Sequence, residues 1–402
     1  MNLEKYKEYI LDLYKSFIPI KAIAPENGGE GEWNRAKVLL EKIKDLFDEI
    51  KVIEVPDNRV KEGSRPNIIA IKYGKNKNKT FWIVAHMDTV PEGDIKLWKY
   101  NPYDVTVEGN KIYGRGVQDN GNGIVIGILV AKILKDYNIV PEFNYGLILA
   151  SDEEVGSNYG IKYILKNYPN FFKEEDWILV PDAGSKDGLE IEIAEKGILW
   201  VKFEVIGRQV HASTPEHGLN STRLGSLLII QLDKVLHEKY DKENKLFANK
   251  STFEPTKVEK NVENINTVPG RFVFYFDCRI LPDYDLDEVY ETILYVCKEF
   301  ERNYNCKVNV EIVHKDYPSI LKNFTNNEFL EKLKEKIKKH KGKDPYIIGI
   351  GGGTYAKYFR EKNLNAIVWS TYNESAHMPN EYIIIDDIIS DTRIIVDLIT
   401  NS

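Results

Sequence analysis

A histidine and a carboxylate at the end of an apolar run are the first residues in this sequence with obvious chemical potential. Residues 81–85 are apolar and lead directly into His86, with Asp88 two positions later and Pro91 beyond it. An unbroken apolar run bounded by turn residues is typical of a strand buried on both faces, and proline cannot donate to the sheet. Side chains two apart on a strand point the same way. His86 and Asp88 could therefore be a metal ligand with its hydrogen-bonded partner, or a buried histidine paired with an acid.

Other metal-competent side chains follow further predicted strands. Carboxyl ends of parallel strands meet at one sheet edge, where ligands bind in open α/β sheets. Two histidines with carboxylates and no cysteine favour catalytic zinc, and cobalt or manganese would accept the same ligands. Helix caps and loop ion pairs are the simpler alternative, but charged residues are seldom buried unless paired or metal-bound. The residues are Glu153 and Glu154 after 145–150, Asp182 after 177–180, His377 after 366–370, and Asp119 in the glycine-rich loop 113–123.

The paired acids Glu153 and Glu154 suggest a division of labour. In a regular strand neighbouring side chains point to opposite faces, so both can serve one centre only if the chain turns after the strand. One acid could then bind metal while the other handles the proton of a metal-bound water. That arrangement is the logic of metal-assisted hydrolysis.

Length and composition limit the classes of protein to consider. The chain has 402 residues, 43% hydrophobic and 29% charged, with a net charge of −7. Two domains are the expectation for this length, and the acidic balance argues against a nucleic-acid partner. No apolar run approaches the ~20 residues of a membrane span, and the N-terminus has no signal-peptide core. Three cysteines without metal-type spacing favour a reduced, cytoplasmic setting.

The order of predicted elements indicates an α/β domain interrupted by a second domain. Strands and helices alternate over 1–196, which predicts a mostly parallel sheet with helices on both faces. Residues 197–315 read β-α-β-β-α-β, the ferredoxin-like arrangement, and the α/β pattern resumes over 316–402. The charged segment 74–79 is expected to be the solvated tip of a hairpin.

These motifs resemble those of the co-catalytic zinc peptidase family of acetylornithine deacetylase, succinyl-diaminopimelate desuccinylase, aminoacylase and glutamate carboxypeptidase. The resemblance covers nearly the whole chain, in order. The matching segments are His86-Met87-Asp88-Thr89-Val90-Pro91, Gly114 to Asp119, and Glu153-Glu154-Val155-Gly156.

The resemblance implies a site with two divalent metal ions. It places His86 and Asp182 on one metal and Glu154 and His377 on the other, with Asp119 bridging. It further implies Glu153 as general base, Asp88 as the partner that orients His86, and a cis peptide bond after Asp119. The inserted domain is expected to serve as a lid and as the dimerisation surface.

Further segments resemble the family's substrate-binding parts. Val210 to Gly218 is similar to a segment whose histidine, here His211, stabilises the reacting carbonyl across a two-fold dimer. Two lid segments match at Asn266 and Arg279, and Gly353-Thr354 matches a loop that receives a substrate carboxylate. The chain departs from the family at Asn120-Gly121-Asn122-Gly123, which often reads Met-Lys-Gly, and at Asp182, which is Glu in the desuccinylases.

We therefore expect a zinc-dependent, homodimeric amidohydrolase acting on an N-acyl amino acid or a short peptide with a free carboxylate. Two alternatives come from other classes of protein. One is a catalytically silent relative that binds or senses a small metabolite. The other is a nucleotide-linked enzyme using Gly351-Gly352-Gly353 as a phosphate cradle at a helix N-terminus. Without the flanking pattern of a dinucleotide site the second alternative has little support.

Overall fold

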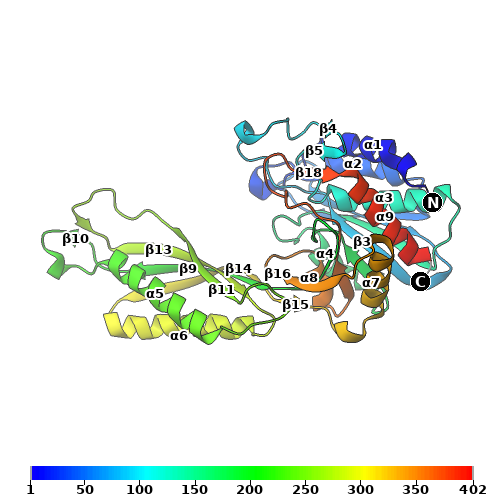
Figure 1. Cartoon of the computed structure of the whole chain (residues 1–402). Helices are drawn as coiled ribbons and strands as arrows, with labels where there is room; N and C mark the ends of the chain where they lie inside the picture. The colour runs from blue at the N-terminus through cyan, green and yellow to red at the C-terminus, as the bar shows by residue number, and fades with distance from the viewer. Residues whose placement is uncertain (1, 401–402) are drawn as a thin grey trace. The chain divides into compact units, whose positions relative to one another are not determined.

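The computed structural model describes residues 2–400, which divide into two compact units. The first unit takes in the chain up to Ile193, Leu321–Ile347 and the part from Thr354 onward. The second, called the inserted unit below, comprises Ala194–Ile320 and Ile348–Gly353. In Figure 1 the inserted unit is the green-to-yellow part that carries the labels α5 and α6. Each unit has its own hydrophobic core.

The first unit is built on a mixed sheet whose central strands are parallel. The order along the sheet is β1-β2-β6-β3-β7-β17-β8. β6, β3, β7 and β17 run parallel, whereas β1, β2 and β8 pair antiparallel with their neighbours. The predicted α/β class with a mostly parallel sheet is thereby confirmed, with antiparallel strands added at the edges. The strands are β1 (Glu49–Pro56), β2 (Ser64–Lys72), β3 (Asn76–His86), β6 (Phe143–Ala150), β7 (Trp177–Val180), β8 (Glu190–Glu195) and β17 (Asn365–Val368).

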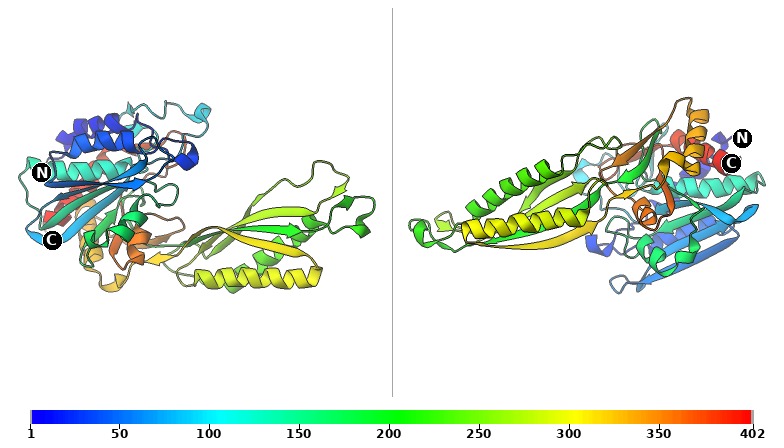
Figure 2. Two further views of the ribbon diagram at one scale, coloured as in Figure 1. Left: turned by 180° about the vertical axis from the view of Figure 1, so that it is seen from behind. Right: turned by 90° about the horizontal axis from the view of Figure 1, so that it is seen from below.

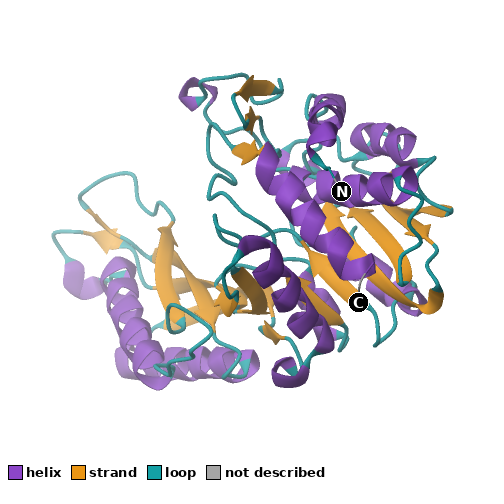
Figure 3. Ribbon diagram, turned by 45° about the vertical axis from the view of Figure 1, so that its right-hand side comes forward, coloured by secondary structure: helices purple, strands orange, loops and turns teal. Residues whose placement is uncertain are grey.

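Helices cover both faces of this sheet (Figure 3). Trp82 and Val84 of β3 share a buried cluster with residues of α4 and α8. On the other face α3 approaches so closely that a Cβ at Gly127 would lie 2.4 Å from Leu147. A larger residue at 127 would therefore displace the Leu147 side chain where α3 crosses β6, and the other residues of α3 are almost all apolar and buried. The helices of the first unit are α1 (Lys7–Phe17), α2 (Trp33–Ile43), α3 (Gly121–Asp136), α4 (Ile161–Asn167), α7 (Glu328–Lys341), α8 (Ala356–Glu361) and α9 (Ile385–Thr400).

A small three-stranded sheet joins two segments that are distant in the sequence. It consists of β4 (Thr106–Glu108), β5 (Lys111–Tyr113) and β18 (Tyr382–Ile384), with Tyr382 opposite Tyr113. The segment that follows His377 is thus tied to the segment that precedes Asp119.

The hairpin expected at residues 74–79 is wrong. β2 and β3 are not neighbours in the sheet, because β6 lies between them and pairs with both. Residues 73–75 therefore connect β2 to β3, and residues 76–79 already belong to β3, which runs parallel to β6. A charged loop between two apolar strands is compatible with either connection, so local composition could not distinguish them.

The inserted unit has the predicted β-α-β-β-α-β order. Its four-stranded antiparallel sheet has the order β11-β13-β9-β14. Alternate residues of β9, such as Val201 and Phe203, pack on α5 and α6, which Figure 2 shows on one face of the sheet. The elements are β9 (Gly197–Ile206), α5 (Ser221–Lys239), β11 (Thr252–Val258), β13 (Arg271–Ile280), α6 (Leu286–Tyr304) and β14 (Lys307–Asp316).

Short strands complete the inserted unit. β10 (Val210–His211) pairs with β12 (Thr267–Val268), and β15 (Ser319–Ile320) pairs with the end of β8. β16 (Tyr346–Ile350) pairs with β8 as well. The chain thus enters and leaves the inserted unit on paired strands, Ala194 lying opposite Ile320. Within residues 2–400, every helix is too short or too polar to cross a membrane.

Candidate metal centre

β3 ends at His86, whose two ring nitrogens have different surroundings. Nδ1 lies 3.0 Å from the backbone oxygen of Asp88, and Nε2 lies 2.9 Å from Oδ1 of Asp119 and 3.7 Å from Oδ1 of Asp182. Burial alone would lower the pKa of His86, but its contacts with Asp119 and Asp182 outweigh burial and raise that pKa well above its usual value. The proton on Nε2 occupies the place that a divalent cation would take.

The fully buried carboxylate of Asp88 holds the turn that carries the paired acids. It accepts hydrogen bonds from the backbone N–H groups of Glu153, at 3.1 Å, and Glu154, at 3.0 Å. Its Oδ1 is also 3.5 Å from Nδ1 of His86. These contacts keep the pKa of Asp88 below its usual value against the opposing effect of burial. Asp88 therefore connects the end of β3 with the turn after β6.

Five of the predicted ligands form two groups that share Asp119. His86, Asp119 and Asp182 form one group, and Asp119, Glu154 and His377 form the other, each with ligand atoms within 4.8 Å of one another. Nε2 of His377 lies 3.1 Å from oxygens of both Asp119 and Glu154. Donor oxygens and imidazole nitrogens, with Asp119 central to both groups, fit a pair of divalent cations.

The acids at this centre repel one another when no cation is present. Burial and the neighbouring carboxylate of Asp119 raise the pKa of Glu154 to about 7, although His377 opposes the shift. Burial is also the main cause of the raised pKa of Glu153, to which Asp182 and Glu154 add. Hydrogen bonds to Asp119 and Glu154 raise the pKa of His377 to about 10. Buried carboxylates this close together are stable in their charged forms only if nearby positive charge compensates them, and the two imidazoles supply only part of that charge.

Glu381 fixes the loop that carries Asp119. This fully buried carboxylate accepts hydrogen bonds from the backbone N–H groups of Gly116, Gln118 and Asp119, and from the guanidinium of Arg115. The sequence alone gave Glu381 no role. The only available signal was its position four residues after His377 in one loop.

Asn120 ties the same loop to Asp182. The Asp119–Asn120 peptide bond is cis, as the resemblance implies. The side-chain amide of Asn120 donates to Oδ1 of Asp182 at 2.7 Å and to the backbone oxygen of Pro181 at 2.8 Å. Asn120 departs from the family pattern, and its side chain holds the predicted ligand Asp182 in place through a hydrogen bond.

The predicted substrate-binding residues fall into two groups. His211 pairs across strands with Thr267, and the backbone oxygen of Asn266 accepts from Ala212 at 2.9 Å. Arg279 lies near the opposite end of β13, where it pairs with Asp277 at 2.7 Å and donates to the backbone oxygen of Gly351 at 3.2 Å. Positions 271 and 279, near the two ends of β13, are eight residues apart, which corresponds to about 26 Å along a strand. One inserted unit therefore keeps the two groups apart.

The loop that ends at Gly353 and Thr354 follows Gly351 directly. Gly353 is the last residue of the inserted unit and Thr354 is the first residue of the next part of the first unit. The Thr354 side chain is buried and accepts a hydrogen bond from the N–H of Ala356 at 3.1 Å.

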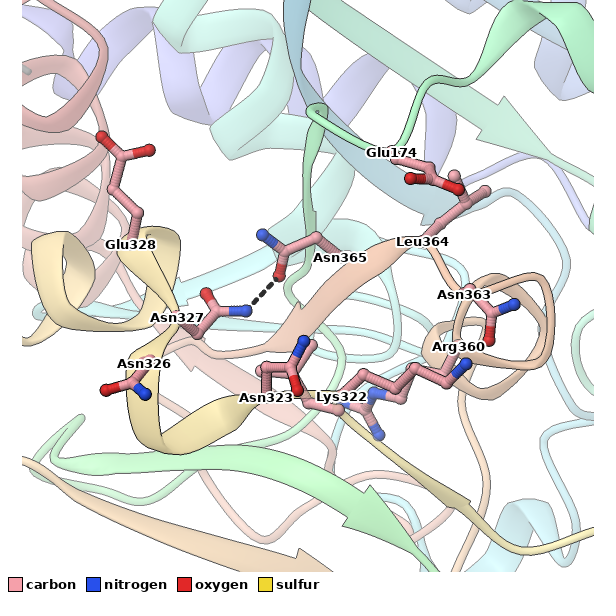
Figure 4. A pocket seen from close by; sticks show the side chains of 11 residues that line it. Glu174, Lys322, Asn323, Asn326, Asn327, Glu328, Arg360, Asn363, Leu364 and Asn365 are labelled. Atoms are coloured by element: carbon pink, nitrogen blue, oxygen red, sulfur yellow. Dashed lines mark hydrogen bonds between the residues drawn. The ribbon is translucent and has the colours of Figure 1, made fainter.

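A depression of about 440 Å³ on the first unit lies away from this centre (Figure 4). Asn323, Asn327 and Asn365 are among its lining residues, and Asn327 donates to Asn365 at 3.1 Å. Asn365 begins β17, whereas His86 ends β3, and both strands run parallel to β7. The depression therefore lies at the opposite edge of the sheet from the candidate ligands.

The chain combines an α/β domain, whose central strands are parallel, with a ferredoxin-like unit inserted into it. Candidate histidine and carboxylate ligands lie at the carboxyl ends of the parallel strands. This combination defines a class of two-domain metallohydrolases. The sequence places the chain within it: residues 82–401 match the model of peptidase family M20/M25/M40, and the chain belongs to this family. The protein is accordingly a metal-dependent hydrolase, and the resemblance seen in the motifs is confirmed.

Three relatives illustrate the match. An uncharacterized metallohydrolase of Methanocaldococcus jannaschii is 40% identical, covering 98% of this chain and 99% of the relative. A succinyl-diaminopimelate desuccinylase of Nitratiruptor is 25% identical, covering 92% and 94%. The crystal structure of an M20 family metallo-carboxypeptidase from Sulfolobus solfataricus has the same fold, with a TM-score of 0.74 at 23% identity and 99% of each chain covered.

Proposed function

We propose that this protein hydrolyses the amide bond of an N-acyl amino acid or a short peptide with a free carboxylate, using two divalent metal ions. The observation that carries the proposal is the pair of ligand groups that share Asp119, with Glu153 beside them and in neither. An acid that is near the ligands but is not one of them is available for proton transfer.

The roles of the residues follow from their positions. His86 and Asp182 would hold one ion and Glu154 and His377 the other, with Asp119 between them. Zinc suits these ligands best, and cobalt or manganese would fit as well. Bound ions of this kind lower the pKa of water to about 7 and polarise a carbonyl group.

Glu153 is the proposed general base. Burial and the surrounding carboxylates raise its pKa, which favours a side chain that can hold a proton between two steps. Glu153 takes a proton from the attacking water and delivers it to the nitrogen of the leaving amine. The hydrogen bonds from the backbone of Glu153 and Glu154 to Asp88 keep both acids oriented for these different tasks.

We further propose that His211 of the partner subunit in a homodimer donates a hydrogen bond to the carbonyl oxygen, while Arg279, Gly353 and Thr354 receive the substrate carboxylate. Asn266 would act beside His211. The separation of about 26 Å between the two ends of β13 supports this division, since one substrate cannot span it. A two-fold axis would give each site His211 from the other chain.

The inserted unit offers a surface suited to such a dimer. Leu227 and Ile230 of α5 are 40% and 65% exposed, and Val258 of the edge strand β11 is 56% exposed. An unpaired edge strand beside exposed apolar side chains is a ready surface for a second copy of the same strand and helix. The three cysteines are free thiols, which supports the proposed cytoplasmic setting.

The alternative of a protein without catalytic activity is less well supported. A catalytically silent relative would be favoured by the loss of Glu153 or of a ligand, yet all are present.

The relatives named above differ in their substrates: one is a desuccinylase and one is a carboxypeptidase. Asp182 resembles the aminoacylase and peptidase branches more than the desuccinylases, so we place acetylated amino acids and dipeptides ahead of succinylated substrates.

A turnover screen tests the proposal. N-acetyl amino acids, dipeptides and N-succinyl amino acids are offered to protein loaded with zinc, cobalt or manganese, with Glu153→Gln as the matched inactive control. Metal-dependent release of an amino acid by the unmodified protein alone is the expected result. Hydrolysis that is equal in the Glu153→Gln variant, or that survives complete metal removal, would contradict the mechanism.

A further inference from the structure

The backbone around His211 is held in place by short-range hydrogen bonds. His211 lies in β10, opposite Thr267 of β12. The N–H of Thr214 donates to the backbone oxygen of His211 at 3.0 Å, which closes a turn directly after the strand. The imidazole therefore projects from a fixed backbone, although it is exposed to solvent.

Ser213 contacts one ring nitrogen of His211 twice. Its backbone N–H lies 3.1 Å from Nδ1, and its hydroxyl Oγ lies 2.7 Å from the same atom. A backbone N–H can only donate, so Nδ1 must offer its lone pair. A neutral imidazole carries one proton, which must then be on Nε2. Within the part of the chain that the structure describes, Nε2 of His211 has no hydrogen-bond partner, so this N–H is free to meet a ligand.

Two of the other histidines, His86 and His237, have the opposite arrangement. Nδ1 of His86 lies 3.0 Å from the backbone oxygen of Asp88, and Nδ1 of His237 lies 2.9 Å from the backbone oxygen of Asp233. A carbonyl oxygen can only accept, so Nδ1 carries the proton in both and Nε2 of the neutral ring has the lone pair. That tautomer suits a metal ligand, as expected of His86. His211 has the reverse.

We propose that Ser213 is a positioning residue that holds His211 in the tautomer protonated at Nε2, so that His211 is a neutral hydrogen-bond donor to an anionic oxygen. The inference rests on the proposed function, in which that oxygen belongs to the reacting amide. A donor aimed at an oxygen that gains negative charge contributes most in the transition state. A ring in this tautomer can serve neither as a metal ligand nor as a base through Nε2.

Nuclear magnetic resonance of protein labelled with ¹⁵N in histidine tests the tautomer directly. The spectrum of the neutral rings should contain one histidine with unprotonated Nδ1 and protonated Nε2 that disappears in His211→Gln. His237 should show the reverse pattern in the same sample, which provides an internal control. A His211 signal with protonated Nδ1, or with an even mixture of tautomers, would overturn the inference.

Variants of the turn separate Ser213 from its surroundings. Ser213→Ala removes the hydroxyl contact, and its neutral His211 should show a smaller fraction of the Nε2-protonated form. The kcat should fall by about 2- to 10-fold, the value of one hydrogen bond, with metal content unchanged. Ser213→Thr should restore both. Thr214→Ala is the matched control, because the Thr214 hydroxyl donates to the backbone oxygen of His211 at 3.3 Å and not to its ring. If Ser213→Ala and Thr214→Ala have the same spectrum, the hydroxyl of Ser213 does not hold the tautomer, and the proposed role of this side chain is wrong.

The tautomer of His211 and the role of His211 in hydrolysis are tested separately. If His211 has the proposed tautomer but His211→Gln keeps full activity, the proposed role of His211 in hydrolysis is wrong while the tautomer stands. If His211→Gln is inactive but Nδ1 is protonated in the unmodified protein, the role in hydrolysis stands and the positioning by Ser213 is wrong.

Discussion

Glu153 and Glu154 carry the same chemical group on neighbouring residues, yet their environments differ. Glu154 faces His377 and Asp119, whereas Glu153 belongs to neither ligand group. Asp88 fixes the backbone of both through two hydrogen bonds, so the difference in side-chain direction is built into the turn. The different roles proposed for the two acids thus depend on backbone geometry and not on side-chain type.

Glu153→Gln should reduce kcat by about 10²- to 10⁴-fold, the usual contribution of a general base. Metal content measured by elemental analysis should stay at the unmodified level, because Glu153 is not a ligand. Glu154→Gln is the comparison: it should lower metal content as well as activity. Loss of metal from Glu153→Gln, or near-normal turnover by it, would show that the two roles are assigned wrongly.

Metal affinity should rise with pH because His377 must lose a proton to bind. Its pKa is raised to about 10 by Asp119 and Glu154, so in the metal-free protein it is protonated at neutral pH. Binding therefore releases this proton, which alone should increase the affinity for manganese by up to about tenfold per pH unit between pH 6 and 8. The protons held by His86 and Glu154 in the metal-free protein add to this dependence. Calorimetry in buffers with different ionisation enthalpies measures the protons released.

A matched variant separates this effect from other histidines. Nε2 of His340 lies 2.8 Å from a carboxylate oxygen of Asp397, and neither residue belongs to a candidate ligand group. His340→Gln should leave the pH dependence of metal binding unchanged. A pH-independent affinity in the unmodified protein would contradict the role of His377.

At the scale of elements, buried carboxylates hold loops together. Glu381 receives three backbone N–H groups and Arg115, and it connects the loop of His377 with that of Asp119. β18 and β5 reinforce the same connection through backbone pairing. Two ligands that are 258 positions apart in the sequence are thereby positioned by one local structure, since 377 − 119 = 258.

Glu381→Ala should destabilise the fold by about 3–5 kcal/mol, because it leaves the Arg115 charge buried without its partner. Metal affinity should fall by about 10- to 100-fold as the Asp119 loop loosens. Denaturant unfolding and metal titration measure the two effects. Glu374→Ala, which removes an exposed acid of the same region, is the control and should change neither.

Asp387 at the start of α9 makes stability depend on pH. Burial, and next the carboxylate of Asp391, raise its pKa to about 6. A folded-state pKa above the unfolded value means that folding stability declines as pH rises from about 4 to 6 and stays lower above pH 6. Asp387→Asn should therefore add about 1–2 kcal/mol to the free energy of unfolding at pH 7.5 and almost nothing at pH 4.

Unfolding in urea at both pH values checks the effect of Asp387. Asp386→Asn, at the exposed neighbour that pairs with Lys7, should not reproduce the gain. An equal effect of Asp387→Asn at pH 4 and pH 7.5 would mean that ionisation is not the cause.

For the whole molecule, the proposed sharing of active sites in a dimer predicts the activity of mixtures of two variants. Glu153→Ala and His211→Ala should each be inactive alone. If each site takes His211 from the partner subunit, one of the two sites in a mixed dimer has both residues. Random exchange of equal amounts should therefore restore about one quarter of the unmodified activity, because half of the dimers are mixed and half of their sites are complete.

Mixed dimers that form but remain inactive would defeat this model of the dimer. Each variant incubated with itself is the control, and size-exclusion chromatography shows whether dimers are present and exchange. Leu227→Glu on α5 offers a second check, because a charge within the proposed dimer surface should give monomers with much reduced activity.

The fold class and most residues of the candidate metal centre could be predicted from the sequence. Strands such as β7 and β13 have strong apolar or alternating patterns, and they begin and end where expected. His86 is the last residue of β3, and Asp182 follows β7 closely. Both therefore lie at the same edge of the sheet, where their side chains are close together. Glu381 and Ser213 were missed because their importance depends on which backbone groups lie opposite them, and no local pattern encodes that.

The hairpin error at 74–79 has a similar cause. Strand order depends on pairing between distant segments, and β6 enters between β2 and β3 from about 70 residues further along the chain. Periodicity predicts that a segment is a strand, but it does not say which strand becomes its neighbour.

The pairing of Ala194 with Ile320 has a consequence for how such a protein can be assembled. Nearly all of the inserted unit is one continuous stretch of the chain, and the two ends of that stretch lie side by side. Deleting that stretch leaves two chain ends close enough to be joined by a tight turn. A different unit with adjacent ends could be spliced in at the same place. Recombination could thus exchange the part that carries His211 without disturbing the part that carries the ligands.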